Sequence, residues 1–268
     1  MNDLRAHSPQ KTPLVFGSPH RHYRLTDSTN QRARELVEAG APHGTVVTAD
    51  EQSAGRGRQG RVWTAPAGKG LLYSAILRPL DERHLLLPLS VPLAVCEAAE
   101  ALRPGVECQV KWPNDIWLEE RKLAGILIEA KPQEGWAVIG VGLNLTVAPE
   151  EFPSDLKWPA TSLHSDACSV TGSMDPKRST RAREEARRAL DAALDHWAAA
   201  PREEILAAWR SRDALRGREV SWQEAGGAPN AEAPRGVAEG IDDSGDLLVR
   251  RLDGDVAVLG AGEVHLRL

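Results

Sequence analysis

Several residue types with distinctive chemistry are scarce in this sequence. Its 268 residues include three cysteines, two methionines, two phenylalanines, two tyrosines and only seven lysines against 26 arginines. The cysteines (Cys96, Cys108 and Cys168) are odd in number and show no Cys-x-x-Cys spacing. This pattern excludes a disulfide framework and a zinc site, and it favours reduced thiols in a cytoplasm. Because lysine is so rare, the position of each lysine carries more information.

Long hydrophobic runs are also missing. The most apolar segment, 85–95, contains two prolines and is shorter than the roughly 20 residues of a membrane span. Residues 1–20 lack the apolar run of a signal peptide. The net charge of −5 gives no indication of nonspecific attraction to nucleic acid. We therefore expect a cytoplasmic protein that binds neither membranes nor nucleic acid.

The length is sufficient for one large domain and one small domain. We expect a flexible lead-in over 1–20, a large domain over 21–214 and a small domain over 215–268. Strands are predicted at 45–49, 70–78, 109–118 (with a bend at Pro113), 122–129 and 136–145. Helices are predicted at 33–39, 85–102, 176–199 and 202–209, and loops at 165–179 and 223–234. The recurring hairpins predict an α+β fold with a mixed, largely antiparallel sheet, and five short strands after 215 predict a small β-barrel.

A nine-residue stretch over 55–63, Gly-Arg-Gly-Arg-Gln-Gly-Arg-Val-Trp, combines three glycines, three arginines and a tryptophan. Glycine lets backbone N–H groups approach a ligand, and arginine matches phosphate and carboxylate oxygens. The glycines have Gly-x-Gly-x-x-Gly spacing, but no helix-forming run follows, so a dinucleotide fingerprint lacks its context. A loop around an anionic small molecule and a mobile basic surface loop both fit this composition.

Two further segments contain candidate site residues. Lys111, Asp115 and Lys122 flank apolar strands, where they form either salt bridges at the rim or a polar site within the sheet. Ser28 has capping-box spacing to Gln31, so it either caps the helix or points its hydroxyl at a ligand. The alternating small residues in 140–144 leave one strand face flat, which suits close approach of a ligand.

Taken together, these segments resemble the motifs of biotin protein ligases, in the same order along about residues 23–268. The matching segments are Asp27-Ser28-Thr29-Asn30, the 55–63 stretch, Lys111-Trp112-Pro113-Asn114-Asp115, Lys122 to Glu129, Gly140 to Asn144 and Ala160 to Leu163. The resemblance implies a catalytic domain like that of class II synthetases and a C-terminal SH3-like barrel. It also implies a two-step reaction, in which biotin and ATP form biotinyl-5′-adenylate and the biotinyl group passes to a lysine of a biotin carboxyl carrier protein.

The resemblance also assigns roles to residues of this chain. The catalytic set is Lys122, Lys111, Arg58, Arg61 and Asp115. The biotin-binding set is Ser28, Thr29, Gln52, Gly55, Arg56, Lys122, Gly125 and Gly142. The set for ATP or the adenylate is Arg58, Arg61, Trp63, Lys111, Asn114, Asn144 and Arg267. Asn114 and Asp115 are candidate ligands of Mg²⁺, and Trp63 is expected to act as a lid over the adenylate.

Some relatives carry an N-terminal winged helix-turn-helix of about sixty residues, and only about twenty residues precede the match here, so the resemblance predicts a ligase without DNA binding. Gln59 stands where the family commonly has another arginine. Two alternatives remain: a lipoate or octanoate ligase or transferase of the same fold, and a biotin-sensing module without turnover. An exposed sheet edge also leaves a homodimer possible.

Overall fold

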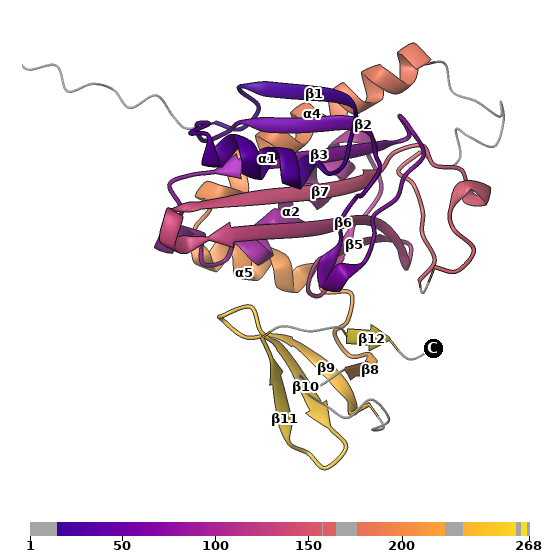
Figure 1. Cartoon of the computed structure of the whole chain (residues 1–268). Coiled ribbons are helices and arrows are strands. Elements are labelled where there is room, and N and C mark those ends of the chain that lie inside the picture. The colour runs from indigo at the N-terminus through magenta and orange to yellow at the C-terminus, as the bar shows by residue number, and fades with distance from the viewer. Residues whose placement is uncertain (1–14, 157, 165–175, 223–232, 261–263, 267–268) are drawn as a thin grey trace, which may run out of the picture.

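The computed structural model describes residues 15–156, 158–164, 176–222, 233–260 and 264–266 (Figure 1). The strands and long helices of the larger domain are β1 (His20–Thr26), α1 (Thr29–Glu38), β2 (Val46–Gln52), β3 (Gly70–Leu77), α2 (Leu87–Leu102), β4 (Gln109–Lys111), β5 (Asp115–Leu118), β6 (Arg121–Lys131), β7 (Trp136–Asn144), α4 (Pro176–Ala199) and α5 (Arg202–Ser211). Those of the smaller domain are β8 (Glu219–Trp222), β9 (Arg235–Ile241), β10 (Leu247–Arg251), β11 (Val256–Leu259) and β12 (Val264–Leu266).

The larger domain is built on a seven-stranded sheet in the order β1-β2-β3-β7-β6-β5-β4. Only β1 and β2 pair in parallel, and the other neighbours are antiparallel. The predicted mixed, largely antiparallel sheet is therefore confirmed. The central strands β3 and β7 are buried along nearly their whole length, which explains their almost continuous apolar sequences.

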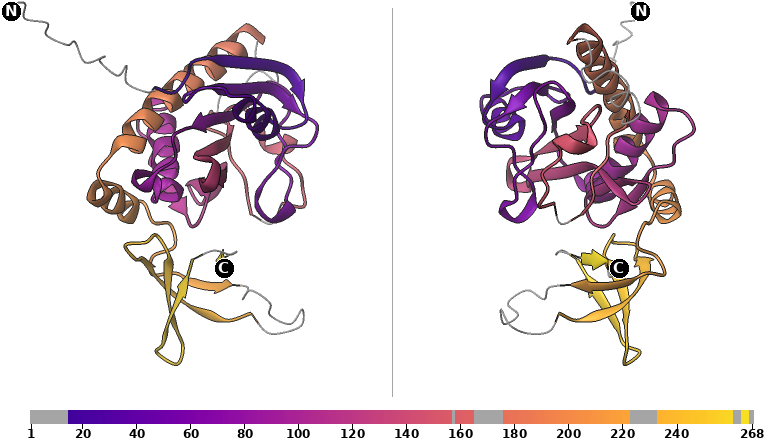
Figure 2. Two further views of the ribbon diagram at one scale, coloured as in Figure 1. Left: turned by 60° about the vertical axis from the view of Figure 1, so that its left-hand side comes forward. Right: turned by 90° about the vertical axis from the view of Figure 1, so that its right-hand side faces the viewer.

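Helices cover the two faces of this sheet unequally (Figure 2). On one face, α1 packs Ala33 and Val37 against apolar side chains of β2, β3 and β7. On the other face, α2 and α4 pack together over a much larger core. Because α1 is short, it covers only part of its face, and the uncovered part holds the cavity described below.

The N-terminal region contains a strand that was not predicted, and it distinguishes the two roles considered for Ser28. Strand β1 was not predicted, because its mixed sequence shows no strand pattern. It forms by parallel pairing with β2 at the sheet edge. Within the 1–20 segment, Phe16 is buried and its backbone N–H donates to Asp195 Oδ1 (2.8 Å); residues 1–14 lie outside the described residues, and the flexible lead-in stays a prediction. Ser28 occupies the N-cap position without a side-chain capping hydrogen bond, so the capping role, one of the two considered for it, is not observed.

The smaller domain is a five-stranded antiparallel sheet in the order β11-β10-β9-β8-β12. The Trp112 indole N–H donates to the Gly245 carbonyl (3.0 Å), and Arg210 pairs with Asp243 (2.7 Å), so its β9–β10 turn is fixed to the larger domain. The described strands form an open ladder with β11 and β12 at its edges, and closure into an SH3-like barrel stays a prediction. The predicted 223–234 loop lies mostly outside the described residues, as does 165–175, whereas 176–179 is helical in α4.

The two cysteines of the described segments, Cys96 and Cys108, are free and buried. This agrees with the prediction of reduced thiols for these two positions. Within the described part of the chain, no helix combines the length and apolar character needed to span a bilayer.

A buried carboxyl group connects α4 to the sheet and makes stability depend on pH. Asp191 accepts a hydrogen bond from the Tyr73 hydroxyl (2.8 Å), and burial raises the pKa of Asp191 to about 6, although Tyr73 and Arg187 act in the opposite direction. An acid whose folded pKa is raised binds more protons in the native state than in the unfolded state, so its stabilising contribution is lost as pH rises from about 4 to 6.

We therefore expect the free energy of unfolding to fall, relative to Asp191→Asn, by up to about 3 kcal/mol between pH 4 and pH 7. The asparagine keeps an acceptor for Tyr73 and does not titrate. Urea unfolding of both proteins across this range is the measurement. Parallel profiles for the two proteins would contradict the assignment of the titration to Asp191.

Candidate active site

The uncovered part of the α1 face contains a trough because small residues align across neighbouring strands. Two adjacent rows of paired residues cross β6, β7, β3 and β2: Gly125, Gly142, Leu72 and Ala49 in one, and Leu127, Gly140, Ser74 and Val47 in the other. The glycines leave the β6 and β7 part of the first row and the β7 part of the second row without side chains, and a cavity of about 260 Å³ lies on this face. The sequence predicted the flat strand, whereas the register of the sheet places it beside Gly125.

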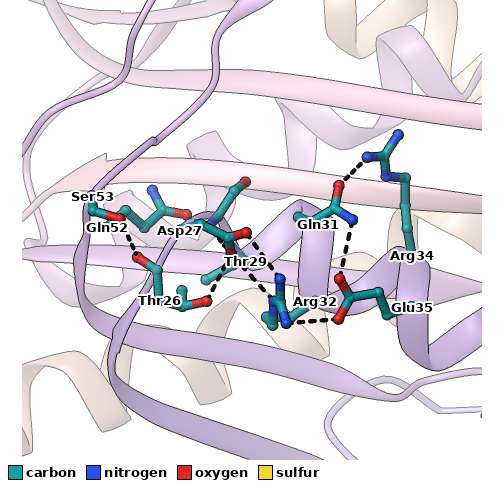
Figure 3. A network of polar contacts seen from close by, with 10 residues as sticks. Thr26, Asp27, Thr29, Gln31, Arg32, Arg34, Glu35, Gln52 and Ser53 are labelled. Carbon is teal, nitrogen blue, oxygen red and sulfur yellow. Dashed lines mark hydrogen bonds and ion pairs between the residues drawn. The ribbon is translucent and has the colours of Figure 1, made fainter.

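One end of the trough is polar. The Thr29 N–H and hydroxyl both lie within hydrogen-bond distance of Gln52 Oε1 (2.7 and 3.1 Å). Asp27, rather than Ser28, binds the first turn of α1, because it accepts from the Ser28 N–H (2.6 Å) and pairs with Arg32 (2.9 Å) (Figure 3). The Ser28 side chain makes no capping bond and lines the cavity.

The opposite end carries positive charge. Lys111 and Asp115 are cross-strand partners on β4 and β5, and both are buried. The Lys122 Nζ lies 2.7 Å from Asp115 Oδ1. The backbone of Lys122 is bonded on both sides to the 159–161 segment, with its N–H donating to the Pro159 carbonyl (2.8 Å) and its carbonyl accepting from Thr161 (3.0 Å). These bonds fix the backbone of Lys122 where its side chain lines the cavity.

The 55–63 stretch folds as a small hairpin over the trough. The backbone N–H of Trp63 donates to the Gly55 carbonyl (3.0 Å), and the backbone N–H of Gly57 donates to the Arg61 carbonyl (2.8 Å). The turn uses left-handed backbone at Gln59 (φ 54°) and Gly60 (φ 74°), which explains the third glycine. A Cβ at Gly55 would lie 2.2 Å from the Trp63 carbonyl oxygen, so the two arms approach too closely for any other residue there.

The hairpin brings Arg58 and Arg61 to the cavity wall. Burial lowers the pKa of Arg58, with the nearby Asp115 charge opposing this shift and Arg61 adding to it. An arginine stays protonated throughout the physiological range. The shift therefore indicates a partly desolvated cation that an anionic ligand would stabilise.

Trp63 lies on the glycine floor. A Cβ added to Gly142 would be 2.3 Å from Trp63 Cε2, and one added to Gly125 would be 2.9 Å from Cζ3. The Lys122 Nζ is 5.6 Å from the centre of the Trp63 ring. The buried indole Nε1 has no hydrogen-bond partner among the described residues. The side chain predicted as a lid therefore occupies part of the trough itself.

Two asparagines fix the loops at the charged end. Asn114 Nδ2 donates to the Ile126 carbonyl (2.9 Å), and Asn144 Nδ2 donates to the Thr161 carbonyl (3.0 Å). Both residues line the cavity. The two amide nitrogens therefore bind backbone carbonyls of β6 and of the 159–161 segment. Each amide oxygen can act only as a hydrogen-bond acceptor.

An aromatic and apolar shelf beside this end was missed in the sequence. Trp158 and Phe152 line the cavity, and the Lys111 Nζ lies 5.8 Å from the centre of the Trp158 ring. Both aromatic residues belong to the segment after β7, and no spacing signal connects them to the other site residues. Proximity in the fold is the only feature that identifies them.

Asp115 and Asn114 supply at most a few oxygens for the Mg²⁺ predicted here. The Asp115 carboxylate is paired with Lys122, and no group of three or more His, Cys, Asp or Glu side chains suited to a metal occurs within the described segments. Mg²⁺ usually binds through one or two carboxylates together with substrate phosphates. The residues present fit an ion that arrives with a triphosphate, and they do not form an all-protein metal cage.

Most of the predicted site residues meet at this one cavity. Those that line it are Ser28, Thr29, Gln52, Arg56, Arg58, Arg61, Trp63, Lys111, Asn114, Asp115, Lys122, Gly125, Gly142 and Asn144. Gly55 packs closely against the Trp63 backbone within the hairpin. Arg267 lies outside the described residues. Asn30 and Gly140 also line the cavity but were not predicted as binding residues, although both stand inside matching motifs.

Residues 22–145 match the model of the biotin/lipoate A/B protein ligase family. The biotin–[acetyl-CoA-carboxylase] ligase of Mycobacterium tuberculosis is 37% identical over 250 residues, which cover 90% of this chain and 87% of that protein. The bifunctional ligase/repressor BirA of Bacillus subtilis is 39% identical over 158 residues. The structure of the Aquifex aeolicus biotin protein ligase in complex with biotin and ATP superimposes with a TM-score of 0.71 at 29% identity, covering 94% of this chain and 99% of that chain.

The chain thus belongs to the biotin/lipoate A/B protein ligase family, because it matches a relative with 37% identity along 87% of that relative's length. Within this family, the similarity is to the biotin protein ligases. The match spans about half, 47%, of the length of the B. subtilis ligase/repressor.

Proposed function

We propose that this protein activates biotin with ATP to form biotinyl-5′-adenylate and transfers the biotinyl group to a lysine of a biotin carboxyl carrier protein. The observation that carries the proposal is one trough with a flat glycine floor, hydrogen-bonding groups at one end and a group of cations at the other. This arrangement suits a neutral ring system connected by an apolar chain to a carboxylate.

In this proposal the ureido ring lies at the polar end, near Ser28, Thr29 and Gln52. The valeryl chain crosses the glycine floor beside Gly125 and Gly142. The carboxylate then reaches Lys122, where it competes with Asp115 for the ammonium group. The Trp158 shelf near Lys111 offers a stacking surface for the adenine ring.

The first step joins two anions. A carboxylate oxygen of biotin attacks the α-phosphorus of ATP, and pyrophosphate leaves with the electrons of the broken P–O bond. Lys122, Lys111, Arg58 and Arg61 would neutralise the carboxylate and phosphate oxygens, which is the main requirement of such a reaction. Mg²⁺, when bound with the triphosphate, would add positive charge to the leaving pyrophosphate.

In the second step, the neutral amine of the carrier lysine attacks the acyl carbon of the adenylate. AMP leaves with the electrons of the C–O bond, and the amine loses a proton as the amide forms. Asp115 is a carboxylate at this junction, through its contact with Lys122. The hairpin over 55–63 would shield the mixed anhydride from water in the interval between the two steps.

The test is the intact mass of a biotin carboxyl carrier domain after incubation with this protein, ATP, Mg²⁺ and biotin. Parallel reactions contain lipoate or octanoate in place of biotin. A mass gain with biotin alone supports the proposal, and a gain with lipoate or octanoate alone would replace it with the alternative acyl ligase. Binding of biotin without adenylate formation would indicate a sensing module.

The position of Trp63 predicts a change in tryptophan fluorescence on ligand binding. Biotin on the glycine floor would displace the indole, whose unpaired N–H makes the present position unfavourable by about 1–3 kcal/mol. We expect biotin to shift the emission of the wild-type protein and not that of Trp63→Phe. Isothermal calorimetry on the variant serves as the control, and an equal shift in both proteins, with binding retained, would contradict the displacement.

Four further statements remain proposals on the strength of the sequence: closure of the C-terminal strands into an SH3-like barrel, a cytoplasmic location, the absence of nucleic-acid binding, and a possible homodimer. For the dimer, the edge strand β1 offers unpaired backbone groups on its outer side. Sedimentation of the ligand-free and biotin-bound protein is the direct measurement.

A further inference from the structure

Glu129 lies where three elements of the site meet. It stands on β6, on the same face as Gly125 and Leu127, since alternate strand residues share a face. Its Oε2 accepts a hydrogen bond from Asn30 Nδ2 of α1 (2.8 Å), and its Oε1 pairs with Arg56 Nη1 of the hairpin (3.4 Å). Arg34 Nη1 of α1 lies 3.5 Å from the same Oε1. The carboxylate of this sheet residue therefore contacts both α1 and the hairpin.

The inner contact orients the polar end of the trough. Asn30 is buried, and Gly140 leaves room for it, because a Cβ there would lie 2.1 Å from Asn30 Oδ1. Since Glu129 accepts from Nδ2, the amide oxygen faces Ser74, whose hydroxyl lies 2.6 Å away. Ser74 Oγ is in turn 2.8 Å from Thr29 Oγ1. Glu129, together with the Leu127 carbonyl that also accepts from Asn30 Nδ2 (3.3 Å), thereby orients the Asn30 amide in a hydrogen-bond network that reaches Thr29 and Gln52.

The outer contact holds the hairpin. Arg56 begins the arm whose backbone bridges to Val62, next to Trp63. Its side chain is 48% exposed and that of Glu129 is 20% exposed. An ion pair of this exposure contributes modestly to stability. Its position is nevertheless informative, because it connects the hairpin to the same carboxylate that orients Asn30.

We propose that Glu129 is a positioning residue that couples closure of the 55–63 hairpin to the orientation of the polar end of the trough. The inference rests on the proposed function, because the bound species are biotin and its adenylate. Glu129 is outside the charged end and contacts no reacting atom in this scheme. Its effect is on how tightly the adenylate is retained and not on the rate at which it forms.

The test compares Glu129→Gln and Glu129→Ala in the full chain. Glutamine retains an acceptor for Asn30 and loses the charge that attracts Arg56, whereas alanine removes both contacts. We expect dissociation of preformed biotinyl-adenylate to accelerate about threefold in Glu129→Gln and about tenfold in Glu129→Ala. The KM for biotin should rise in the same order, while kcat for adenylate formation at saturating substrates stays within about twofold.

The matched control is Glu38→Gln. Glu38 pairs with Lys131 (3.1 Å), so this pair also connects α1 to β6 but does not contact the hairpin. A double-mutant cycle with Arg56→Gln isolates the outer contact: the two substitutions should be less than additive in adenylate dissociation. Equal effects of Glu129→Gln and Glu38→Gln, or full additivity with Arg56→Gln, would overturn the proposal.

A second readout is independent of the reaction. Limited trypsin digestion of the ligand-free protein, followed by mass spectrometry, reports cleavage after Arg56, Arg58 and Arg61. We expect faster cleavage at these sites in Glu129→Gln and Glu129→Ala than in Glu38→Gln. If wild-type protein forms no adenylate, the proposed function fails, and this digestion alone decides whether Glu129 holds the hairpin.

Discussion

Substitution of Lys122 by alanine is expected to abolish adenylate formation almost completely. Lys122 is the cation of β6 at the charged end, with its backbone fixed by the 159–161 segment and its ammonium group 2.7 Å from Asp115. In the proposed reaction it neutralises the carboxylate and the phosphate where they meet. Loss of one such preorganised group reduces kcat by about 100-fold to 1,000-fold.

Pyrophosphate release with saturating ATP and biotin is the measurement for this variant. Lys131→Ala is the control, because Lys131 is on the same strand and pairs with Glu38 at the surface. Thermal unfolding of both variants separates a catalytic effect from the cost of leaving the buried Asp115 without its partner. If Lys122→Ala formed the adenylate at a rate near that of the wild type, the role assigned to Lys122 would be wrong.

Substitution of Gly142 by valine is expected to close the trough to biotin. A Cβ at this position already lies 2.3 Å from the Trp63 ring, so a branched side chain would project into the space assigned to the valeryl chain. Overpacking of this kind costs about 1–3 kcal/mol. The Kd for biotin should therefore rise by about 10-fold to 100-fold, while valine remains compatible with a β-strand.

Calorimetric titration with biotin tests this prediction, and circular dichroism checks the fold of the variant. Ala130→Val introduces the same branched side chain at an exposed position of the neighbouring strand β6, so it should leave biotin binding unchanged. Tight binding by a well-folded Gly142→Val protein would show that the ligand does not cross the glycine floor.

Much of the candidate site was predictable from local sequence signals. The glycine and arginine composition of 55–63 indicated a loop suited to an anion, and the scarcity of lysine directed attention to Lys111 and Lys122. Both inferences depend on properties of residues close together in the chain. The structure places these segments at one cavity, and the roles of the residues there remain to be tested by the substitutions above.

Other features could not be derived from the sequence because they depend on contacts between distant segments. Strand β1 has a mixed sequence and is ordered by its pairing with β2. Asn30 and Glu129 are 99 residues apart and meet only when α1 packs on the sheet. The spacing of Ser28 left open whether its side chain caps α1 or faces a ligand, and the structure places it at the cavity wall while the adjacent Asp27 accepts from the Ser28 N–H.

By itself, the sequence determined the hairpin-rich sheet, the flexible backbone of the glycine-arginine loop and the segments that supply cations. These follow from side-chain alternation, glycine conformational freedom and fixed charge, all of which are local properties. Only the tertiary structure decided which strands became neighbours, and hence that Gly125 and Gly142 form one floor. It also decided that Trp63 lies on that floor, because strand register and side-chain packing are set by the whole core and not by any one segment.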